Sequence, residues 1–466
     1  MARRFTIIGI LLFLTLVAIP VSAQTPTPST GPVYIVQSGD TLWSIALRFN
    51  VSVTDLENAN NLPDQNIFSG QELIIPGLAG ISGTLTTSPV AYGETLHSLA
   101  RQYGIDESLL RSLNHILSPD ELYAGYNLTL LQQENKPTWT DRTSIDKGET
   151  LLEAAASQNT DPWTIAGINS LAGTWDSLPG DILFLPGNNT ANPATGFPMA
   201  FESVQVDPLP FIQGSTAQIK ITVPQGTTLT GILVDQPLHF FATADGSQVA
   251  FQGVYALTDP GVYPLSIDAT LADGTRQSYA QMVPVSAGQF LSENLEVATE
   301  TIDPAVTGPE DAWLRSMTAP ANPDKYWQGM FRLPVDFQYC VRSRFGTRRS
   351  YNNGALFTFH SGLDFGVCSQ AHPLDIYAPA DGVVVFTGLK TVRGNVTIID
   401  HGWGIYSGLF HQSEILVSVG DHVTAGQLIG KIGATGRVTG PHLHWDLWVN
   451  GIQVDPTVWL NEEFPH

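Results

Sequence analysis

The spacing of hydrophobic residues changes several times along the 466-residue chain, and the first change lies near the N-terminus. A mostly apolar run over 5–21 follows two arginines and ends at the small residues Val21-Ser22-Ala23. A positive start, an apolar run and a small-residue cleavage site are typical of a secretory signal peptide. We therefore predict a signal peptide at 1–23, with an uncleaved membrane anchor as the alternative. No other apolar run is long enough to cross a bilayer, so no membrane contact is expected after signal cleavage.

A pattern that occurs three times follows a Pro/Thr-rich linker at 24–32. Gly-Asp/Glu-Thr-Leu opens each copy at Gly39, Gly93 and Gly148, an asparagine follows 21 residues later, and a second glycine with an apolar run closes the copy. Apolar positions after Thr41 have helical spacing, and apolar runs flank the helical region. Coincident landmarks at a fixed offset indicate an internal repeat. We predict three small α+β units with the order strand, helix, helix, strand.

Residues 197–290 carry a different pattern. Apolar and β-branched residues alternate with polar ones, as over 217–223, and Asp-Gly turn signals interrupt them. Short alternating segments separated by such turns are typical of an antiparallel β-sandwich. We predict a sandwich-like spacer domain here, followed by a proline-rich connector over 291–335 that lies on its neighbours.

The part of the chain from 336 onward holds eight of the eleven histidines. His360 and Asp364 are four residues apart, and Gly362 between them argues against a helix, so an extended segment would point both side chains to one face. His442 and His444 likewise share one face of a predicted strand. Two histidines plus one carboxylate, with an open fourth position, are typical of a catalytic zinc site. Segments with strand character are 382–386, 395–400, 405–410, 427–432 and 443–449.

The net charge argues against one class of partner. Lys and Arg total 21 and Asp and Glu total 43, which gives a net charge of −22 at pH 7. Nucleic-acid binding through phosphate contacts is therefore not expected, and neither is electrostatic attraction to anionic membranes or wall polymers. Such polymers must be recognised by shape, hydrogen bonds and stacking.

The first copy of the repeat resembles a LysM domain. The resemblance rests on Tyr34-x-Val36-x-x-Gly39-Asp40-Thr41-Leu42-x-x-Ile45-Ala46, Asn60 and Gly70-Gln71-x-Leu73-x-Ile75-Pro76. It implies binding to N-acetylglucosamine-containing glycans, such as peptidoglycan or chitin, in a shallow groove formed by loops beside the helices. The residues that it assigns to glycan binding are Gly39, Asp40, Thr41 and Asn60. The other two copies depart further from the family pattern, so glycan binding and a spacer role are both open for them.

The C-terminal motifs resemble the lysostaphin-like (LytM-type) zinc metallopeptidases. The motifs are S-R-F-G at 343–346, H-x-G-x-D at 360–364, A-P-A-D-G-V-V at 378–384, G-N-V-x-I-x-D-H-G at 394–402, V-G-D-x-V-x-x-G-Q-x-I-G at 419–430 and T-G-x-x-T-G-P-H-L-H at 435–444. The resemblance implies that Zn²⁺ is bound by His360, Asp364 and His444. It assigns His411 and His442 as the catalytic pair and implies hydrolysis of peptide bonds in peptidoglycan stems or cross-bridges.

Two cysteines are present, Cys340 and Cys368. An exported protein permits a disulfide between them, and two buried free thiols are the alternative. We favour the disulfide.

The sequence thus predicts a multidomain protein with small α+β (βααβ) LysM repeats, an all-β sandwich-like spacer and a β-rich lysostaphin-like catalytic domain. The segments are a signal peptide (1–23), a linker (24–32), LysM repeat 1 (33–77), LysM-like repeats 2 (87–132) and 3 (142–187), the spacer (197–290), a connector (291–335) and a zinc metallopeptidase domain (336–466). The predicted function is a secreted, zinc-dependent peptidoglycan endopeptidase in the extracellular space or cell envelope of a bacterium. The alternatives are a non-hydrolytic wall-binding activator of other cell-wall hydrolases and a purely glycan-binding adhesin.

Overall fold

The structure is a computed structural model of the chain, and it describes residues 31–78, 80–118, 121–132, 141–145, 148–178, 181–186, 196–299, 302–335, 339–367 and 374–466. The predicted signal peptide and nearly all of the predicted linker therefore lie outside the described residues. Of the residues described, one compact unit comprises those up to residue 86 together with Gln132, and a second comprises 87–131 together with those from 141 onward. Among the described residues, no helix has the length and apolar character needed to cross a membrane.

The first repeat folds as the predicted strand–helix–helix–strand unit. Its elements are β1 (Val33–Ile35), α1 (Leu42–Arg48), α2 (Val53–Asn60) and β2 (Glu72–Ile74), and β1 pairs antiparallel with β2. The hydroxyl of Thr41 accepts the N–H of Ser44, and the hydroxyl of Ser44 accepts the N–H of Thr41. This reciprocal cap satisfies backbone donors that the start of a helix leaves unpaired. Tyr34 and Ile45 are fully buried and form the centre of a small core.

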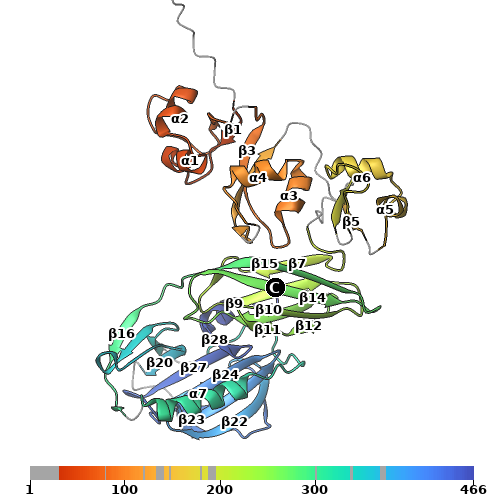
Figure 1. Cartoon of the computed structure of the whole chain (residues 1–466). Coiled ribbons are helices and arrows are strands. Elements are labelled where there is room, and N and C mark those ends of the chain that lie inside the picture. Colours follow the sequence, from red (N-terminus) through yellow and green to blue (C-terminus); the bar gives the residue numbers. More distant parts are fainter. Residues whose placement is uncertain are drawn as a thin grey trace, which may run out of the picture. The chain divides into compact units, whose positions relative to one another are not determined.

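The second and third repeats have the same element order (Figure 1). The second comprises β3 (Thr84–Pro89), α3 (Leu96–Tyr103), α4 (Glu107–Leu113) and β4 (Asn127–Gln132). The third comprises β5 (Asp141–Ser144), α5 (Leu151–Ser157), α6 (Pro162–Ile168) and β6 (Ile182–Leu185). Thr95 and Thr150 cap the first helices of these repeats as Thr41 does in the first.

The asparagine of the repeat pattern has the same structural role in all three copies. The Nδ2 of Asn60 donates to the carbonyl oxygens of Leu56 and Ile74 at 2.9 and 2.8 Å, and its Oδ1 accepts the N–H of Ile74 at 2.6 Å. Asn114 and Asn169 make the corresponding three bonds in their own repeats. This asparagine therefore fastens the second helix of each repeat to its last strand.

Residues 203–286 form two packed β-sheets, as expected for the sandwich-like spacer. The sheet orders are β11-β10-β14-β15-β8 and β12-β13-β9-β7. The strands are β7 (Ser203–Asp207), β8 (Phe211–Ile212), β9 (Thr216–Thr222), β10 (Thr228–Leu233), β11 (Gln236–Leu238), β12 (Phe240–Ala242), β13 (Gln248–Gly253), β14 (Gly261–Thr270) and β15 (Arg276–Ser286). Alternate residues of β9 and β14, including Ile219, Ile221, Leu265 and Ile267, share one buried core between the sheets.

The connector expected over 291–335 contains regular structure that the sequence analysis did not predict. Strand β16 (Ser292–Leu295) pairs parallel with β18, and helix α7 spans Pro304–Thr318. Asp303 caps the helix, and Pro304 occupies its first turn, where a missing N–H costs nothing. Figure 1 shows α7 alongside the catalytic sheet. Its Leu314 is buried in a cluster with Phe410 and Trp448.

The C-terminal domain is built on one large, mostly antiparallel sheet. Its main strand order is β17-β20-β27-β24-β23-β22-β25, with β28 paired to β27 and β26 paired to β24 and β21. The elements are β17 (Tyr339–Ser343), β18 (Arg348–Tyr351), β19 (Leu356–Phe359), β20 (Gly362–Val367), β21 (Asp375–Tyr377), β22 (Gly382–Lys390), β23 (Gly394–Gly402), β24 (Ile405–Ile415), β25 (His422–Val423), β26 (Leu428–Ile432), β27 (His442–Val449), β28 (Ile452–Val454) and α8 (Pro456–Asn461). The predicted fold class, with LysM repeats and a β-rich catalytic domain, is confirmed.

Strand β27 divides its residues between two environments. Leu443, Trp445 and Leu447 point into the main hydrophobic core of the domain. Since successive side chains of a strand alternate between faces, His442 and His444 point to the opposite side. The sheet therefore has one apolar face that holds the domain together and one face that carries polar side chains.

Candidate metal centre and active site

Strands β20 and β27, with the segment that precedes β20, bring the predicted ligands together. The sheet register sets Asp364 of β20 directly opposite His444 of β27, and Phe410 of β24 lies opposite His444 on the other side. His360 precedes β20 by two residues. Because β20 and β27 are neighbours, residues about 80 positions apart in the chain meet at one point.

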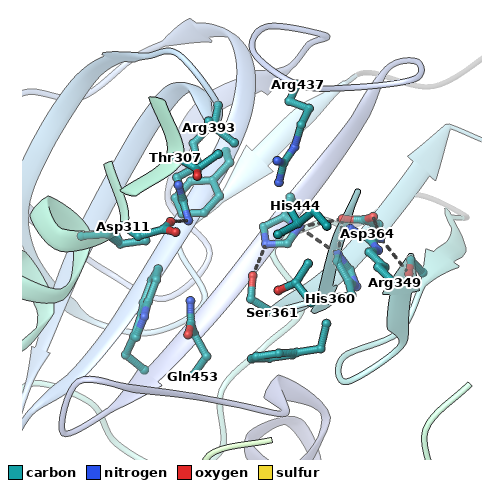
Figure 2. Close-up of a pocket in the computed structure, with 18 of the residues that line it drawn as sticks. Thr307, Asp311, Arg349, His360, Ser361, Asp364, Arg393, Arg437, His444 and Gln453 are labelled. Atoms are coloured by element: carbon teal, nitrogen blue, oxygen red, sulfur yellow. Dashed lines mark hydrogen bonds and ion pairs between the residues drawn. The ribbon is translucent and has the colours of Figure 1, made fainter. Parts of the chain in front are cut away.

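The three predicted ligands form a tight buried cluster (Figure 2). The Oδ1 of Asp364 lies 3.0 Å from Nε2 of His360 and 2.8 Å from Nδ1 of His444. The same two ring nitrogens are 3.0 Å apart. All three side chains offer one ligand atom to a common point, with the atoms within 4.8 Å of one another.

The other ring nitrogens of the two histidines have fixed acceptors. The carbonyl oxygen of Arg344 lies 3.0 Å from Nδ1 of His360, and Oδ1 of Asp446 lies 2.6 Å from Nε2 of His444. When each imidazole is neutral, its proton sits on the bonded nitrogen and a lone pair faces Asp364. Lone pairs and a carboxylate that converge repel one another unless a positive charge lies among them. The donor set therefore fits a divalent metal ion such as zinc.

His411 and His442 lie beside this cluster and face each other. Their ring centroids are 4.9 Å apart. The Nδ1 of His411 contacts the carbonyl oxygen of Thr435 at 2.8 Å, and Nδ1 of His442 contacts that of Gly440 at 2.8 Å. These contacts hold the proton on Nδ1 in both neutral rings, so Nε2 is the nitrogen able to accept a proton. The Nε2 of His442 lies 3.7 Å from Oδ1 of Asp364, which places this ring at the edge of the cluster.

The charges at the cluster are set by burial and by close neighbours. Burial alone would raise the pKa of the Asp364 carboxyl, but His360 and His444 hold its pKa well below the usual range. Burial, together with the neighbouring imidazoles, lowers the pKa of His411 to about 3. Burial lowers the pKa of His444 as well, but the carboxylates of Asp446 and Asp364 outweigh it and raise that pKa to about 9. Asp364 is thus ionised and His411 is neutral near pH 7. The carboxylates of Asp364 and Asp446 stabilise positive charge at His444, which lies between them.

The cluster lies in a cleft of about 870 Å³. Residues of the sandwich domain, of α7 and of the catalytic domain line it. Five arginines contribute to the lining, namely Arg315, Arg342, Arg349, Arg393 and Arg437. Four carboxylates line it as well, namely Asp235, Glu293, Asp311 and Asp364, so the charges of the cleft nearly balance although the whole chain is strongly acidic.

Two supporting residues of the cluster were not predicted from the sequence. Arg349 lies with Nη2 3.5 Å from Oδ2 of Asp364 and Nε 2.5 Å from Glu293, so it supports the ligand carboxylate from outside. Asp446 orients His444. The sequence did contain a signal for Asp446: it lies two residues after His444 on the same strand, so its side chain points to the same face. Arg349 lies on β18, and no local pattern connects it with the site.

The predicted glycan-binding side chains of the first repeat take part in its own fold. Asp40 accepts the Tyr34 hydroxyl at 2.7 Å and lies 3.3 Å from Nη2 of Arg48, with its side chain 7% exposed. Thr41 caps α1. Asn60 fastens α2 to β2. The assignment of glycan contacts to Gly39, Asp40, Thr41 and Asn60 stays a prediction.

The corresponding loop of the second repeat contacts the sandwich domain. The side chain of Gln281 on β15 accepts the N–H of Gly93 at 2.7 Å and donates to the carbonyl oxygen of Glu94 at 3.0 Å. The N–H of Ala124 donates to the carbonyl oxygen of Met282 at 2.9 Å. Two segments of this repeat are thus packed on one strand of its neighbour.

Cys340 lies on β17. Its predicted partner, Cys368, lies outside the described residues, so the disulfide stays a prediction.

Comparison with known families agrees with the architecture. Residues 34–76 and 90–130 match the LysM domain, and residues 358–456 match peptidase family M23. The chain therefore contains LysM domains followed by a peptidase family M23 domain. The matched C-terminal segment holds all five predicted site residues, whereas α7 precedes it.

Several relatives match part of the chain. The chain is 40% identical over 136 residues to the peptidoglycan DD-endopeptidase ShyA of Vibrio cholerae, which covers 29% of this chain and 30% of that protein. It is 40% identical over 97 residues to the DD-carboxypeptidase/endopeptidase Mpg of Neisseria meningitidis, which covers 21% of this chain and 22% of that protein. The chain thus spans less than a third of the length of these relatives.

Solved structures of the same type also match. A putative peptidase M23 from Pseudomonas aeruginosa is 26% identical with a TM-score of 0.41, covering 54% of this chain and 95% of that one. The catalytic domain of lysostaphin from Staphylococcus simulans is 26% identical with a TM-score of 0.21, covering 33% of this chain and 98% of that one.

Proposed function

We propose that this protein is a secreted, zinc-dependent endopeptidase that hydrolyses peptide bonds in peptidoglycan and is held on the wall by its LysM repeats. The observation that carries the proposal is the convergence of His360, Asp364 and His444 in an open cleft, with His411 and His442 beside them. The M23 match and the names of the relatives support peptidoglycan as the substrate.

Zinc is the metal that this donor set favours. Two imidazole nitrogens and one carboxylate oxygen would hold it through His360, His444 and Asp364, which leaves a position open. When bound, zinc would supply Lewis-acid chemistry that polarises the scissile carbonyl and makes water a stronger acid. The hydrogen bonds of the outer nitrogens to Arg344 and Asp446 would keep both imidazoles oriented for it.

His411 and His442 would handle the protons of hydrolysis. The Nδ1 of His411 contacts the carbonyl oxygen of Thr435, so its Nε2 is the atom that would take a proton from the attacking water. A proton must also reach the leaving amine, and the ring of His442 lies close enough to share that task. The Nδ1 atoms of both rings contact backbone carbonyl oxygens, and these contacts fix the orientation of both imidazoles.

The arginines in the cleft lining support a substrate that carries carboxylates. Peptidoglycan stem peptides are acidic, and guanidinium groups bind carboxylates well. The apolar run and small-residue site at the N-terminus support export, which places the substrate in the cell envelope or outside the cell.

The test combines metal analysis with digestion of purified sacculi. We expect about one zinc per chain and release of soluble muropeptides whose new termini identify the cleaved bond. His411→Ala should keep the metal and lose turnover by at least about 100-fold. Intact sacculi with a zinc-loaded wild-type protein would contradict the proposal and favour the non-hydrolytic activator.

A further inference from the structure

Helix α7 reaches the active-site region through one buried carboxylate. The Oε2 of Glu310 accepts the N–H of Val392 at 3.0 Å, and its Oε1 accepts the N–H of Arg393 at 3.0 Å. The same Oε1 accepts Nη1 of Arg393 at 3.1 Å. Oδ1 of Asp311, the next residue of the helix, accepts Nη2 of Arg393 at 2.6 Å. The turn between β22 and β23 is therefore held by three bonds to Glu310 and one to Asp311.

The turn between β22 and β23 also holds His411 in an unusual backbone conformation. The carbonyl oxygen of Arg393 accepts the N–H of His411 at 3.0 Å. His411 has a φ of 62°, which lies in the left-handed region that residues with a β-carbon seldom adopt. Such a conformation persists only where the surroundings fix it.

The ring of His411 is linked to the same turn. Its Nδ1 contacts the carbonyl oxygen of Thr435, and two residues later the N–H of Arg437 donates to the carbonyl oxygen of Val392 at 2.7 Å. Backbone and ring of His411 are thus both connected to the 392–393 turn. Figure 2 shows Asp311 next to Arg393 at the left of the view, with His444, Asp364 and His360 to their right.

We infer that Glu310 is a positioning residue for His411, and that α7 is a functional part of the active site although it precedes the matched M23 segment. The inference rests on the proposed function of His411 in proton transfer. Glu310 touches neither metal ligand nor substrate position; it fixes the turn that fixes the backbone and ring of His411. Losing it should therefore affect the chemical step rather than metal binding or substrate binding.

The main variant is Glu310→Gln, which keeps the size of the side chain and turns one acceptor into a donor that faces a backbone N–H. We expect kcat on a soluble muropeptide to fall about 10- to 100-fold, because small misplacement of a reacting group has effects of that size. Zinc content should stay within about twofold of the wild type, and KM should change less than kcat because Arg393 keeps its bond to Asp311. Hydrogen exchange of the β24 amides around His411 should become faster.

Two controls separate positioning from general stability. Trp313→Leu loosens the packing of α7 without removing a hydrogen bond of Glu310: Trp313 lies one helical turn further along and packs on Phe386 with ring centroids 4.6 Å apart. It should lower the unfolding temperature but keep kcat within about threefold. Asp311→Asn removes the more exposed of the two carboxylates, which bonds to the Arg393 guanidinium and not to the backbone of the turn. It should lower kcat less than Glu310→Gln does.

The outcomes are distinct. A loss of kcat in Glu310→Gln no larger than in Trp313→Leu, a loss confined to KM or zinc content, or unchanged exchange around His411 would overturn the inference. If Glu310→Gln does not fold, Glu310→Asp replaces it: the shorter carboxylate cannot reach both N–H groups, and an intermediate loss of kcat is expected. If the wild type shows no turnover, the proposed function fails, and the exchange measurement alone decides whether Glu310 holds His411.

Discussion

Every histidine of the site has one ring nitrogen committed to an acceptor, and in three of the four rings that acceptor is a backbone carbonyl. His444 is different, because its Nε2 lies 2.6 Å from the carboxylate of Asp446, which is completely buried. A carboxylate makes an imidazole a stronger electron donor and locks its orientation. Asp446 is therefore the outer residue with the largest expected effect on the metal.

We predict that Asp446→Asn weakens zinc binding about 10- to 100-fold, because the amide keeps the shape but loses the charge. The dissociation constant is measured by competition with a chelator of known affinity. Asp400→Asn is the matched control: this carboxylate accepts the N–H of Gly402 and lies away from the cluster, so zinc affinity should stay within about threefold. Equal losses in both variants would show that the effect is one of folding.

His401 illustrates a buried histidine with a structural role. Its Nδ1 contacts the carbonyl oxygen of Asp381 at 2.8 Å, and its Nε2 contacts the hydroxyl of Ser407 at 2.9 Å. Ser407 also accepts the indole N–H of Trp445, so its own hydroxyl proton is free to point at His401. This arrangement suits the neutral imidazole, and burial lowers the pKa of His401 to about 4.

The low pKa of His401 predicts a pH dependence of stability. Since its folded-state pKa lies below the unfolded value of 6.5, the unfolded state binds the proton more tightly, and stability falls as the pH drops from about 6.5 to about 4. The contribution lost over this window is about 3 kcal/mol. Urea unfolding of the wild type and of His401→Gln at about pH 7 and about pH 4.5 measures it. The variant, although weaker at neutral pH, should lose less on acidification; His422→Gln, at an exposed position, should behave as the wild type.

The sequence predicted site residues that lie in short motifs and missed those that depend on tertiary contacts. His360 with Asp364, and His442 with His444, are spaced so that an extended chain puts each pair on one face, and the structure places them so. Arg349 and Glu310 reach the site from β18 and α7. Their roles follow from how separate elements pack, which no local spacing records.

At the scale of elements, the alternation of apolar and polar residues predicted the strands correctly, whereas proline content wrongly predicted an irregular connector in place of helix α7. The segments expected at 382–386, 395–400 and 405–410 lie within β22, β23 and β24. Helix α7 was missed because Pro304 and Pro309 favoured an irregular connector. Both prolines lie in the N-terminal half of the helix, and the apolar side of its second half, with Leu314, packs on the catalytic sheet. Tertiary burial thus outweighed a weak local propensity.

The repeats differ in what their first helices expose. Trp43 of the first repeat, two residues after the capping Thr41, is 67% exposed. His97 occupies the same position of the second repeat, next to the loop that bonds to Gln281 of the sandwich. Contiguous exposed apolar side chains on a folded surface often mark binding sites, and Leu47, one helical turn after Trp43, is 66% exposed as well. The first repeat therefore exposes an apolar patch on its first helix, whereas the second repeat packs on its neighbour.

We predict that Trp43→Ala weakens binding to a chitin oligomer by about tenfold, since loss of an aromatic contact at a binding site costs this much or more. His97→Ala is the matched control and should leave the affinity within about twofold. Isothermal calorimetry with the His411→Ala background measures both. Equal losses in the two variants would mean that the second repeat also binds glycan, and no loss in Trp43→Ala would exclude this surface.

The whole molecule is strongly acidic, whereas the charges that line the cleft nearly balance. Lys and Arg number 21 against 43 Asp and Glu, yet five arginines line the space around the metal cluster. Long-range fields follow the net charge and are screened beyond about 10 Å at ordinary salt concentrations, whereas contacts inside the cleft act at short range. Attachment to an anionic wall should therefore come from the repeats, by stacking and hydrogen bonds, with overall electrostatics opposing it.

This division of charge predicts how wall binding responds to salt. Purified sacculi carry carboxylates, so screening should weaken the repulsion and leave the short-range contacts intact. The fraction of the His411→Ala variant that sediments with sacculi should stay constant or rise when NaCl increases from about 0.05 M to about 0.3 M. Trp43→Ala, measured in parallel, should bind less at every salt concentration with the same trend. A fall of about tenfold over this range would instead show that ionic attraction holds the protein on the wall, and the arginines of the cleft rather than the repeats would then be its anchor.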